Sequence, residues 1–290
     1  MRPKKAAEWK SFYAHEREKL GEVGIAERLD RAAELSLPSG GALVFPHTML
    51  SVTGHLTAAV ARAVVRSGAD EVLALGVLHG GRRSQADLVK RARGGEQAAR
   101  QALRKIHEGG DSLCEEEFSL DNFVALLELA ARREGKKPPR VHARYPFLVG
   151  DDPERLPGIA DVAKLAERMP VVATTDPIHH GNGYGTALEA LRPEEDAATQ
   201  SWAQESIQAQ LDLLARGQWS AFARLTAEVR SDFRDVGPVL GWLTRRAGAV
   251  TGSILELHLV DYAEVLGADA PTWVAGPLMR MQLDRSADAA

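Results

Sequence analysis

Short apolar runs alternate with longer amphipathic segments along this chain, and no other feature of the sequence limits its fold so strongly. The runs are aliphatic or β-branched and are bounded by glycine, proline or charged residues, as buried strands usually are. They cover residues 41–46, 71–78, 145–149 and 170–174. Residues 254–260 (ILELHLV) alternate apolar and polar side chains, which predicts a further strand.

The segments between these runs have the periodicity of helices. Residues 55–67 and 119–134 place apolar side chains three and four positions apart, as amphipathic helices do, and residues 159–168 repeat the pattern more briefly. Residues 199–230 are rich in Ala, Gln, Leu and Arg, which predicts two helices separated near Gly217.

Alternating strands and helices predict an α/β fold with a central mixed, largely parallel sheet and helices on both of its faces. The chain contains no repeat and no segment with the composition of a linker, and EGKKPPR (134–140) is typical of a turn before a strand. We therefore expect residues 1–290 to form a single domain.

Composition narrows the range of partners. The net charge is −4, from 36 basic and 40 acidic residues, so no general attraction to nucleic acid or anionic membranes is expected. No apolar run approaches the ~18 residues of a membrane span, and the positive start is not followed by the apolar stretch of a signal peptide. The single cysteine, Cys114, cannot form an internal disulfide. We expect a cytoplasmic protein. The sequence leaves open whether it forms a homo-oligomer.

Three histidines directly follow or closely follow predicted strands. His47 comes after GALVFP, His79 after EVLALGVL, and His179 shortly after PVVAT. Ligands of open α/β sheets bind beyond the carboxyl ends of the strands, where neighbouring strand ends meet. Three converging imidazoles would suit Fe, Zn, Cu or Ni. The alternative is that each histidine is an ordinary loop residue, and the pattern alone leaves both interpretations open.

The stretch TTDPIHHGNGYG (174–185) contains further candidates. Asp176 precedes a proline and fits a turn, but it also fits a carboxylate that orients an imidazole or binds a metal. His180 is a second proton carrier or, as we favour, a solvated neighbour of His179. Three glycines predict close backbone packing rather than a phosphate loop, because no Gly-Lys-Ser/Thr follows: Gly181, Gly183 and Gly185.

Seven short motifs follow one another along almost the whole chain. They are WKSFYAHEREKL (9–20), VFPHTMLSVTGHLTAA (44–59), LALGVLHG (73–80), EEEFSLDNF (115–123), PFLVGD (146–151), VVATTDPIHHG (171–181), and the pair LVDYAE and WVAGPL (259–264 and 273–278). In this order they resemble the Memo family, whose fold is similar to that of class III (LigB-like) extradiol dioxygenases.

The resemblance implies roles for individual residues. His47 and His79 take the positions of metal ligands, and Asp176 matches the aspartate of the motif S-S-D-x-x-H. His179, rather than His180, takes the position of that motif's histidine, which lies beside the metal as an acid–base residue or ligand. The implied fold is the α/β domain that the periodicity predicts.

The sequence also departs from the family pattern. Thr48-Met49-Leu50 replaces A-G-Y after the first histidine, so we expect an aromatic wall of the pocket to be missing, and Phe118 replaces the histidine of E-H-S. The cysteine or glutamate that the relatives use has no counterpart in SDFRDVGPVLGWL (231–243). We expect Asp235, with Asp232 as second choice, to be the third ligand.

Two histidines and one carboxylate form the facial triad of non-heme Fe(II) oxygenases. We therefore expect Fe(II), with Zn or Cu as alternatives, and an enzyme that uses O₂ on a small molecule, with aromatic and amino-acid-derived compounds as candidates. Tyr184 and Trp273 are candidate pocket walls, with core packing as the alternative for both. A non-catalytic metal- or peptide-binding protein is the competing interpretation, and a zinc hydrolase ranks third.

Overall fold

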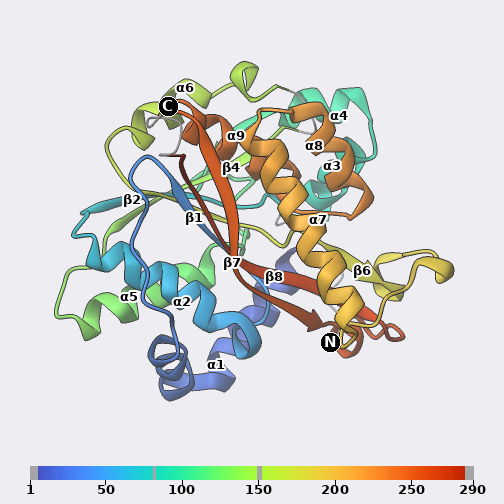
Figure 1. Cartoon of the computed structure of the whole chain (residues 1–290), viewed down its shortest axis with the longest axis horizontal. Helices are drawn as coiled ribbons and strands as arrows, with labels where there is room; N and C mark the ends of the chain where they lie inside the picture. Colours follow the sequence, from blue (N-terminus) through green and yellow to red (C-terminus); the bar gives the residue numbers. More distant parts are fainter. Residues whose placement is uncertain (1–5, 81–82, 149–151, 285–290) are drawn as a thin grey trace.

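The computed structural model describes residues 6–80, 83–148 and 152–284, and the strands in these ranges form one sheet (Figure 1). The strands are β1 (Ala42–Phe45), β2 (Glu71–Leu75), β3 (Lys105–Glu108), β4 (Arg140–Phe147), β5 (Val171–Thr174), β6 (His179–Gly181), β7 (Val250–Asp261) and β8 (Thr272–Leu283). The helices are α1 (Ala6–Asp30), α2 (Leu50–Arg66), α3 (Arg83–Arg93), α4 (Gln97–Leu103), α5 (Asp121–Arg133), α6 (Ile159–Ala166), α7 (Ala197–Ala215), α8 (Trp219–Glu228), α9 (Phe233–Arg245) and α10 (Ala263–Leu266). None of these helices is long and apolar enough to cross a membrane.

The sheet is mixed, with a parallel centre. Its order is β3-β4-β2-β5-β1-β8-β6, and β7 pairs with the other edge of β8. The four central strands β4, β2, β5 and β1 run parallel, whereas β3 and β8 run against their neighbours. The predicted fold class, an α/β domain with a mixed, largely parallel sheet between helices, is confirmed.

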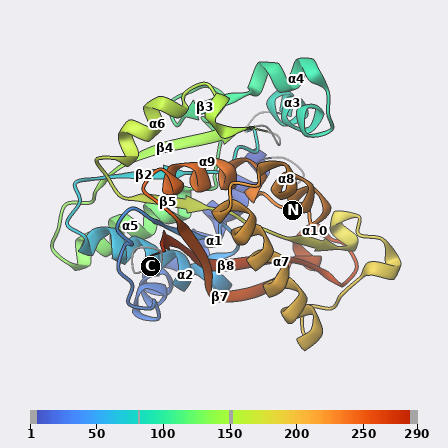
Figure 2. The ribbon, with the colours of Figure 1, turned by 45° about the horizontal axis from the view of Figure 1, so that its top comes forward.

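Helices cover both faces of the sheet because successive strand residues point to opposite sides. Leu43 of β1 packs into a core with α1, α2 and α5, and its neighbour Val44 packs into a second core with α6, α7, α8 and α9. Strands buried on both faces are nearly continuous apolar runs, as those in the sequence are. Figure 1 shows the two helical layers, and Figure 2 shows α3 and α4 at the β3–β4 end of the sheet.

The long strand β8 places two distant segments at one point. On one edge it pairs with β1 through Val44–Met279 and with β6 through His179–Val274. Gly276 lies between these two pairings, and a side chain there would meet Pro46 and Thr48, so the chain leaving β1 passes close to it. The residues that follow β1 and those that begin β6 therefore meet beside β8.

Most predicted elements are present, and several were missed. The predicted strands correspond to β1, β2, β4, β5 and β7, and the predicted helices to α2, α5 and α6. The helical pair ends and restarts around Gly217, as expected, to form α7 and α8. The elements without a sequence prediction are α1, α3, α4, α9, α10, β3, β6 and β8. Residues 149–151 of the PFLVGD motif lie outside the described residues.

Candidate metal centre

His47, His79 and Asp232 meet at the carboxyl edge of the parallel strands. His47 follows β1, His79 follows β2, and Asp232 immediately precedes α9. The Nε2 atoms of both histidines lie 3.5 Å from Oδ2 of Asp232. Their ligand atoms all lie within 4.8 Å of one another. The expected meeting of strand ends has thus brought together His47 and His79, and Asp232 joins them from more than a hundred positions further along the chain.

His179 joins this group from the start of β6. Its Nε2 lies 3.6 Å from Oδ2 of Asp232. Its Nδ1 donates a hydrogen bond of 2.8 Å to the carbonyl of Arg230, a residue held at a φ of +52°. A carbonyl only accepts, so Nδ1 carries a proton and, in a neutral ring, Nε2 carries the lone pair.

The rings of His47 and His79 are also oriented through Nδ1. In His47, Nδ1 lies 3.2 Å from Oγ1 of Thr174. In His79, Nδ1 lies 2.8 Å from Oε1 of Glu117, whose Oε2 accepts the backbone N–H of His79 at 2.6 Å. Metal-binding histidines commonly use the second nitrogen in this way, because it fixes the tautomer and the plane of the ring. Glu117 has no role in the sequence prediction, although it lies in the EEEFSLDNF motif.

The distances between these atoms fit a metal ion. Contacts of 3.5 and 3.6 Å are longer than good N–H···O hydrogen bonds. Two ligands that each lie about 2.1 Å from one metal are separated by roughly 3.0–3.5 Å. Two imidazoles and one carboxylate are also a donor set that non-heme iron, zinc and copper accept. His47, His79 and Asp232 therefore fit the expected metal, with His179 beside them.

Charge is concentrated in this buried cluster. Burial alone would lower the pKa of His79, but Glu117 and Asp232 outweigh it and raise that pKa to about 10. Burial would raise the pKa of Asp232, but His179, His47 and His79 hold it well below its usual range. Asp232 is thus a carboxylate in the folded protein, which is the form that binds a cation.

Asp176 supports His47 rather than His179. Its Oδ1 accepts the backbone N–H of His47 at 3.2 Å, and its Oδ2 lies 3.5 Å from Nε2 of the same residue. Its backbone carbonyl accepts the N–H of Asp232. Burial raises the pKa of Asp176. Asp176 is therefore part of the site, where the imidazole that it contacts is that of His47, whereas the carbonyl of Arg230 orients His179.

The structure favours Asp232 over Asp235 as the third ligand. Asp235 lies in the first turn of α9, almost fully buried. Its Oδ1 accepts the backbone N–H of Leu148 at 2.9 Å, and its Oδ2 lies 3.6 Å from the guanidinium of Arg93. The predicted third ligand, Asp235, is therefore corrected to Asp232. The residue three positions earlier, before the helix begins, points toward the histidines.

Aromatic side chains line the pocket above the cluster, a cavity of about 160 Å³. The lining includes Trp9, Tyr13, Phe118, Tyr184 and Tyr262. Phe118 stacks on His79 with ring centroids 4.5 Å apart. The positions that replace A-G-Y contribute no ring to this lining, but α1 and the segments around Phe118 and Tyr262 supply other rings.

Two candidate walls have different positions. Tyr184 lines the pocket, and its ring centroid lies 5.0 Å from that of His179. Trp273 is 0% exposed and lies on the other side of β6, where it stacks on His180. For Trp273 the core-packing alternative therefore holds, whereas Tyr184 faces the candidate site.

His180 does not contact the cluster, although it is not solvated either. It is buried, and its Nε2 accepts the backbone N–H of Arg192 at 3.0 Å. Burial lowers its pKa to about 4, with Arg192 and Arg230 adding to the effect. Because neighbouring residues in a strand point to opposite faces, His179 faces the pocket and His180 faces away from it. His180 is a packed, neutral histidine.

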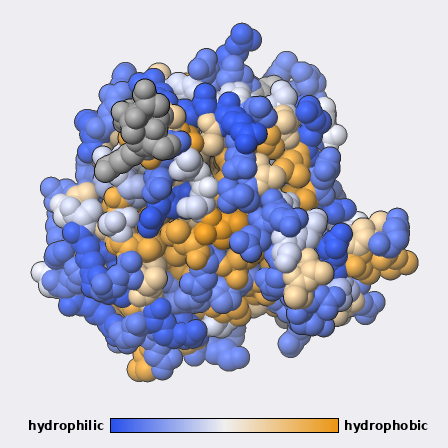
Figure 3. All heavy atoms as spheres, in the orientation of Figure 1, coloured by the Kyte–Doolittle hydropathy of each residue, from blue (hydrophilic) through white to orange (hydrophobic). Residues whose placement is uncertain are grey.

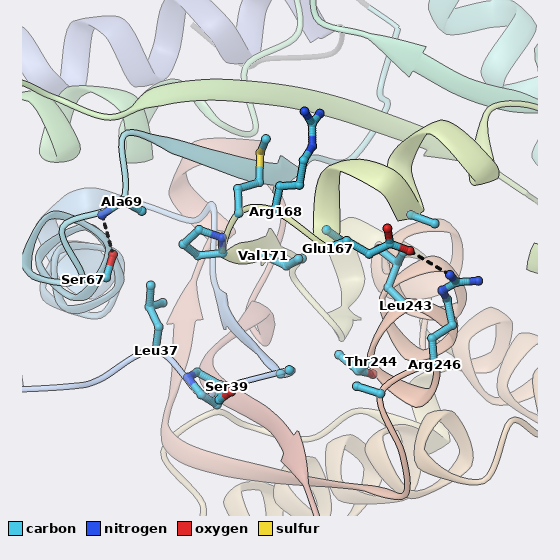
Figure 4. Close-up of a pocket in the computed structure, with 18 residues that line it drawn as sticks. Leu37, Ser39, Ser67, Ala69, Glu167, Arg168, Val171, Leu243, Thr244 and Arg246 are labelled. Atoms are coloured by element: carbon cyan, nitrogen blue, oxygen red, sulfur yellow. Dashed lines mark hydrogen bonds and ion pairs between the residues drawn. The ribbon is translucent and has the colours of Figure 1, made fainter.

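A larger cavity lies at the opposite edge of the sheet. It has a volume of about 620 Å³ and is lined around the starts of β1 and β5 and the end of α9 (Figure 4). Its charged groups include Glu167 and Arg246, which form an ion pair of 3.1 Å. The smaller pocket has the histidines and carboxylates, so size does not identify the candidate site.

No known protein-family model matches this chain. No curated protein matches it either. The assignment of a function therefore depends on the geometry described above and on the resemblance of the motifs.

Proposed function

We propose that this protein is a mononuclear non-heme iron enzyme of the oxygenase type, which uses O₂ to oxidise a small aromatic molecule. The observation that carries the proposal is the convergence of three imidazole Nε2 atoms on one carboxylate oxygen, Oδ2 of Asp232, at 3.5–3.6 Å. The resemblance to Memo proteins and to extradiol dioxygenases agrees with it.

His47, His79 and Asp232 would hold the metal, which supplies a site where O₂ and a chelating substrate bind together. Thr174 and Glu117 keep the two imidazoles in the orientation that presents Nε2 to this position. Glu117 also accepts three backbone N–H groups, of His79, Phe118 and Ser119, which fix the loop after β2 relative to the segment before α5.

His179 is the residue that moves a proton. Its Nδ1–H is held by the carbonyl of Arg230, so its Nε2 can accept a proton from a substrate hydroxyl in the pocket and return it later. The ring is placed against Tyr184, which limits its rotation. His179 lies outside the group of three whose ligand atoms are all close together, which agrees with a proton-transfer role.

The pocket favours a small, planar substrate. Rings surround it, and aromatic side chains pack against other rings in offset or edge-to-face arrangements. The hydroxyls of Tyr13 and Tyr262 lie 2.9 Å apart, and burial raises the pKa of both well above the usual value. Both remain protonated at neutral pH, and since one hydroxyl donates to the other, the second keeps its proton to donate to an oxygen of the substrate.

The test is O₂ uptake by protein that has been purified without oxygen and loaded with Fe(II), assayed with catechols and aminophenols. We expect uptake that depends on Fe(II) and on one of these substrates. We also expect His179→Gln to retain iron but to lose most of the uptake. Tight zinc binding with no uptake under any condition would instead favour the zinc hydrolase.

A further inference from the structure

A second group of potential metal ligands lies away from the candidate centre, between α2 and β7. His55 comes from α2, and Glu256 and His258 come from β7. Oε1 of Glu256 lies 2.9 Å from Nε2 of His55 and 2.8 Å from Nε2 of His258. The ligand atoms of the three residues all lie within 4.8 Å of one another.

A β-bulge in β7 aims the two strand residues at α2. Ile254 pairs with Met279, but Glu256 pairs with Leu278, so Leu255 is an extra residue in the strand. Ile254 packs into the core formed with α7 and α9, and after the bulge it is Leu257 that packs there. The bulge has therefore moved the even-numbered positions to the opposite face. Without it, Glu256 and His258 would point into the core beneath α7.

Figure 1 shows where these elements lie, with β7 crossing the middle of the view and α2 below it. Figure 3 shows that hydrophobic residues gather near the centre of this face, although hydrophilic residues cover most of it. The side chains of Glu256 and His258 are 40% and 36% exposed, so an ion from solvent can reach them. His55 is buried behind them.

We propose that His55, Glu256 and His258 form a second metal site, which binds Zn²⁺ or a similar divalent transition-metal ion. Two imidazoles and a carboxylate are a common zinc donor set, and three protein ligands leave a position for water. The ion would join α2 to β7. Helix α2 begins three residues after His47.

The hydrogen bonds of the cluster set the conditions for binding. Among the described residues, Nδ1 of His55 is buried and has no hydrogen-bond partner. Without metal, the proton of this ring is therefore best placed on Nε2, where it is donated to Glu256. Metal binding has to move or displace that proton, so the site should bind Zn²⁺ less tightly than a site whose Nδ1 atoms already have partners.

Equilibrium dialysis with Zn²⁺ alone tests the site. We expect the wild type to bind two equivalents and His258→Gln to lose the weaker one. The matched control is His142→Gln, since His142 also bonds a strand glutamate, Glu71, at 2.9 Å but has no third potential ligand beside it among the described residues. That control should bind as the wild type does.

A second variant separates this site from the candidate centre. Asp232→Asn should lose the tighter equivalent and keep the weaker one, and Zn²⁺ should still raise its melting temperature. Adding His258→Gln to Asp232→Asn should abolish that rise. If His258→Gln binds as much Zn²⁺ as the wild type with the same affinities, the second site is overturned, whatever happens at Asp232. If only Asp232→Asn is without effect, the candidate centre fails and the second site stands.

Discussion

At the carboxyl edge of the sheet, His47 and His79 each have Nδ1 beside a side-chain oxygen, whereas between α2 and β7 the Nδ1 of His55 is buried and has no partner in the part of the chain that the structure describes. Both clusters contain two histidines and one carboxylate. They differ in how their ligands are held. In the first cluster, formed by His47, His79 and Asp232, neighbouring groups orient the imidazoles and aromatic rings enclose the site. Ligand type alone therefore indicates where a metal can bind, and the surrounding hydrogen bonds indicate where chemistry can follow.

The largest expected effect separates Asp232 from Asp235. Asp232→Asn removes the negative charge on which three imidazoles converge, so we expect Fe(II) affinity at the first cluster to fall by more than about 100-fold, or ~2.8 kcal/mol. Asp235→Asn keeps an oxygen that can accept the N–H of Leu148, and affinity should stay within about threefold. Fe(II) affinity is measured by competition with a chelator. If both variants lose affinity equally, Asp232 is not distinguished from Asp235 as the third ligand.

The next largest effect is expected on stability, from the close backbone packing of the glycines that follow His179 and His180. Gly181 has a φ of +107°, and a Cβ there would lie 2.0 Å from the carbonyl oxygen of Pro271. We expect Gly181→Ala to lower the free energy of unfolding by about 2–3 kcal/mol. Gly185 has a φ of +70° with open space around it, so Gly185→Ala should cost only about 1 kcal/mol. Urea denaturation compares the two, and similar losses would show that close packing does not restrict Gly181.

Glu117 tests whether orientation distinguishes the two clusters. Glu117→Gln keeps an oxygen but loses the charge that holds His79, so Fe(II) affinity at the first cluster should fall about 10-fold. Zinc binding at His55, Glu256 and His258 should be unchanged. If Glu117→Gln binds Fe(II) as tightly as the wild type, the orientation of His79 by this carboxylate does not contribute to metal binding.

The smallest effect concerns His180, the neighbour that faces away from the pocket. Its folded pKa of about 4 lies below the usual value of 6.5, so the unfolded chain binds a proton first as the pH falls. The stability that His180 contributes is fully present above pH 6.5 and is lost between pH 6.5 and about 4. We expect the loss of stability between pH 7.5 and 5.0, followed by urea denaturation, to be smaller in His180→Gln.

If acidification destabilises the wild type and His180→Gln equally, His180 is not the buried neutral residue described above. Gln can still accept the N–H of Arg192, so the substitution removes the titrating group and keeps an acceptor.

Sequence reasoning located the first cluster because its histidines follow buried strands, whose apolar runs are easy to recognise. The sequence favoured Asp235 over Asp232, because the choice depends on where α9 begins, and helix boundaries are set by local capping and packing. The short strand β6 has only three residues, two of them histidines, which is too little for a periodic pattern.

The second cluster was outside the reach of sequence patterns for a different reason. In ILELHLV the alternation is regular, and it predicts one face for Ile254, Glu256 and His258 together. The bulge at Leu255 places Ile254 on the opposite face from the other two, and it depends on pairing with β8. Trp9, Tyr13 and Tyr262 likewise reach the pocket only through the packing of α1 and the end of β7.

The most direct test of the metal centre is an anomalous difference map, collected at the iron edge, from a crystal grown without oxygen in the presence of Fe(II). We predict a peak within bonding distance of Nε2 of His47, Nε2 of His79 and a carboxylate oxygen of Asp232, with Asp235 still bonded to Leu148. A peak that lacks Asp232 as a ligand, or a crystal with no iron between these histidines, would contradict the account.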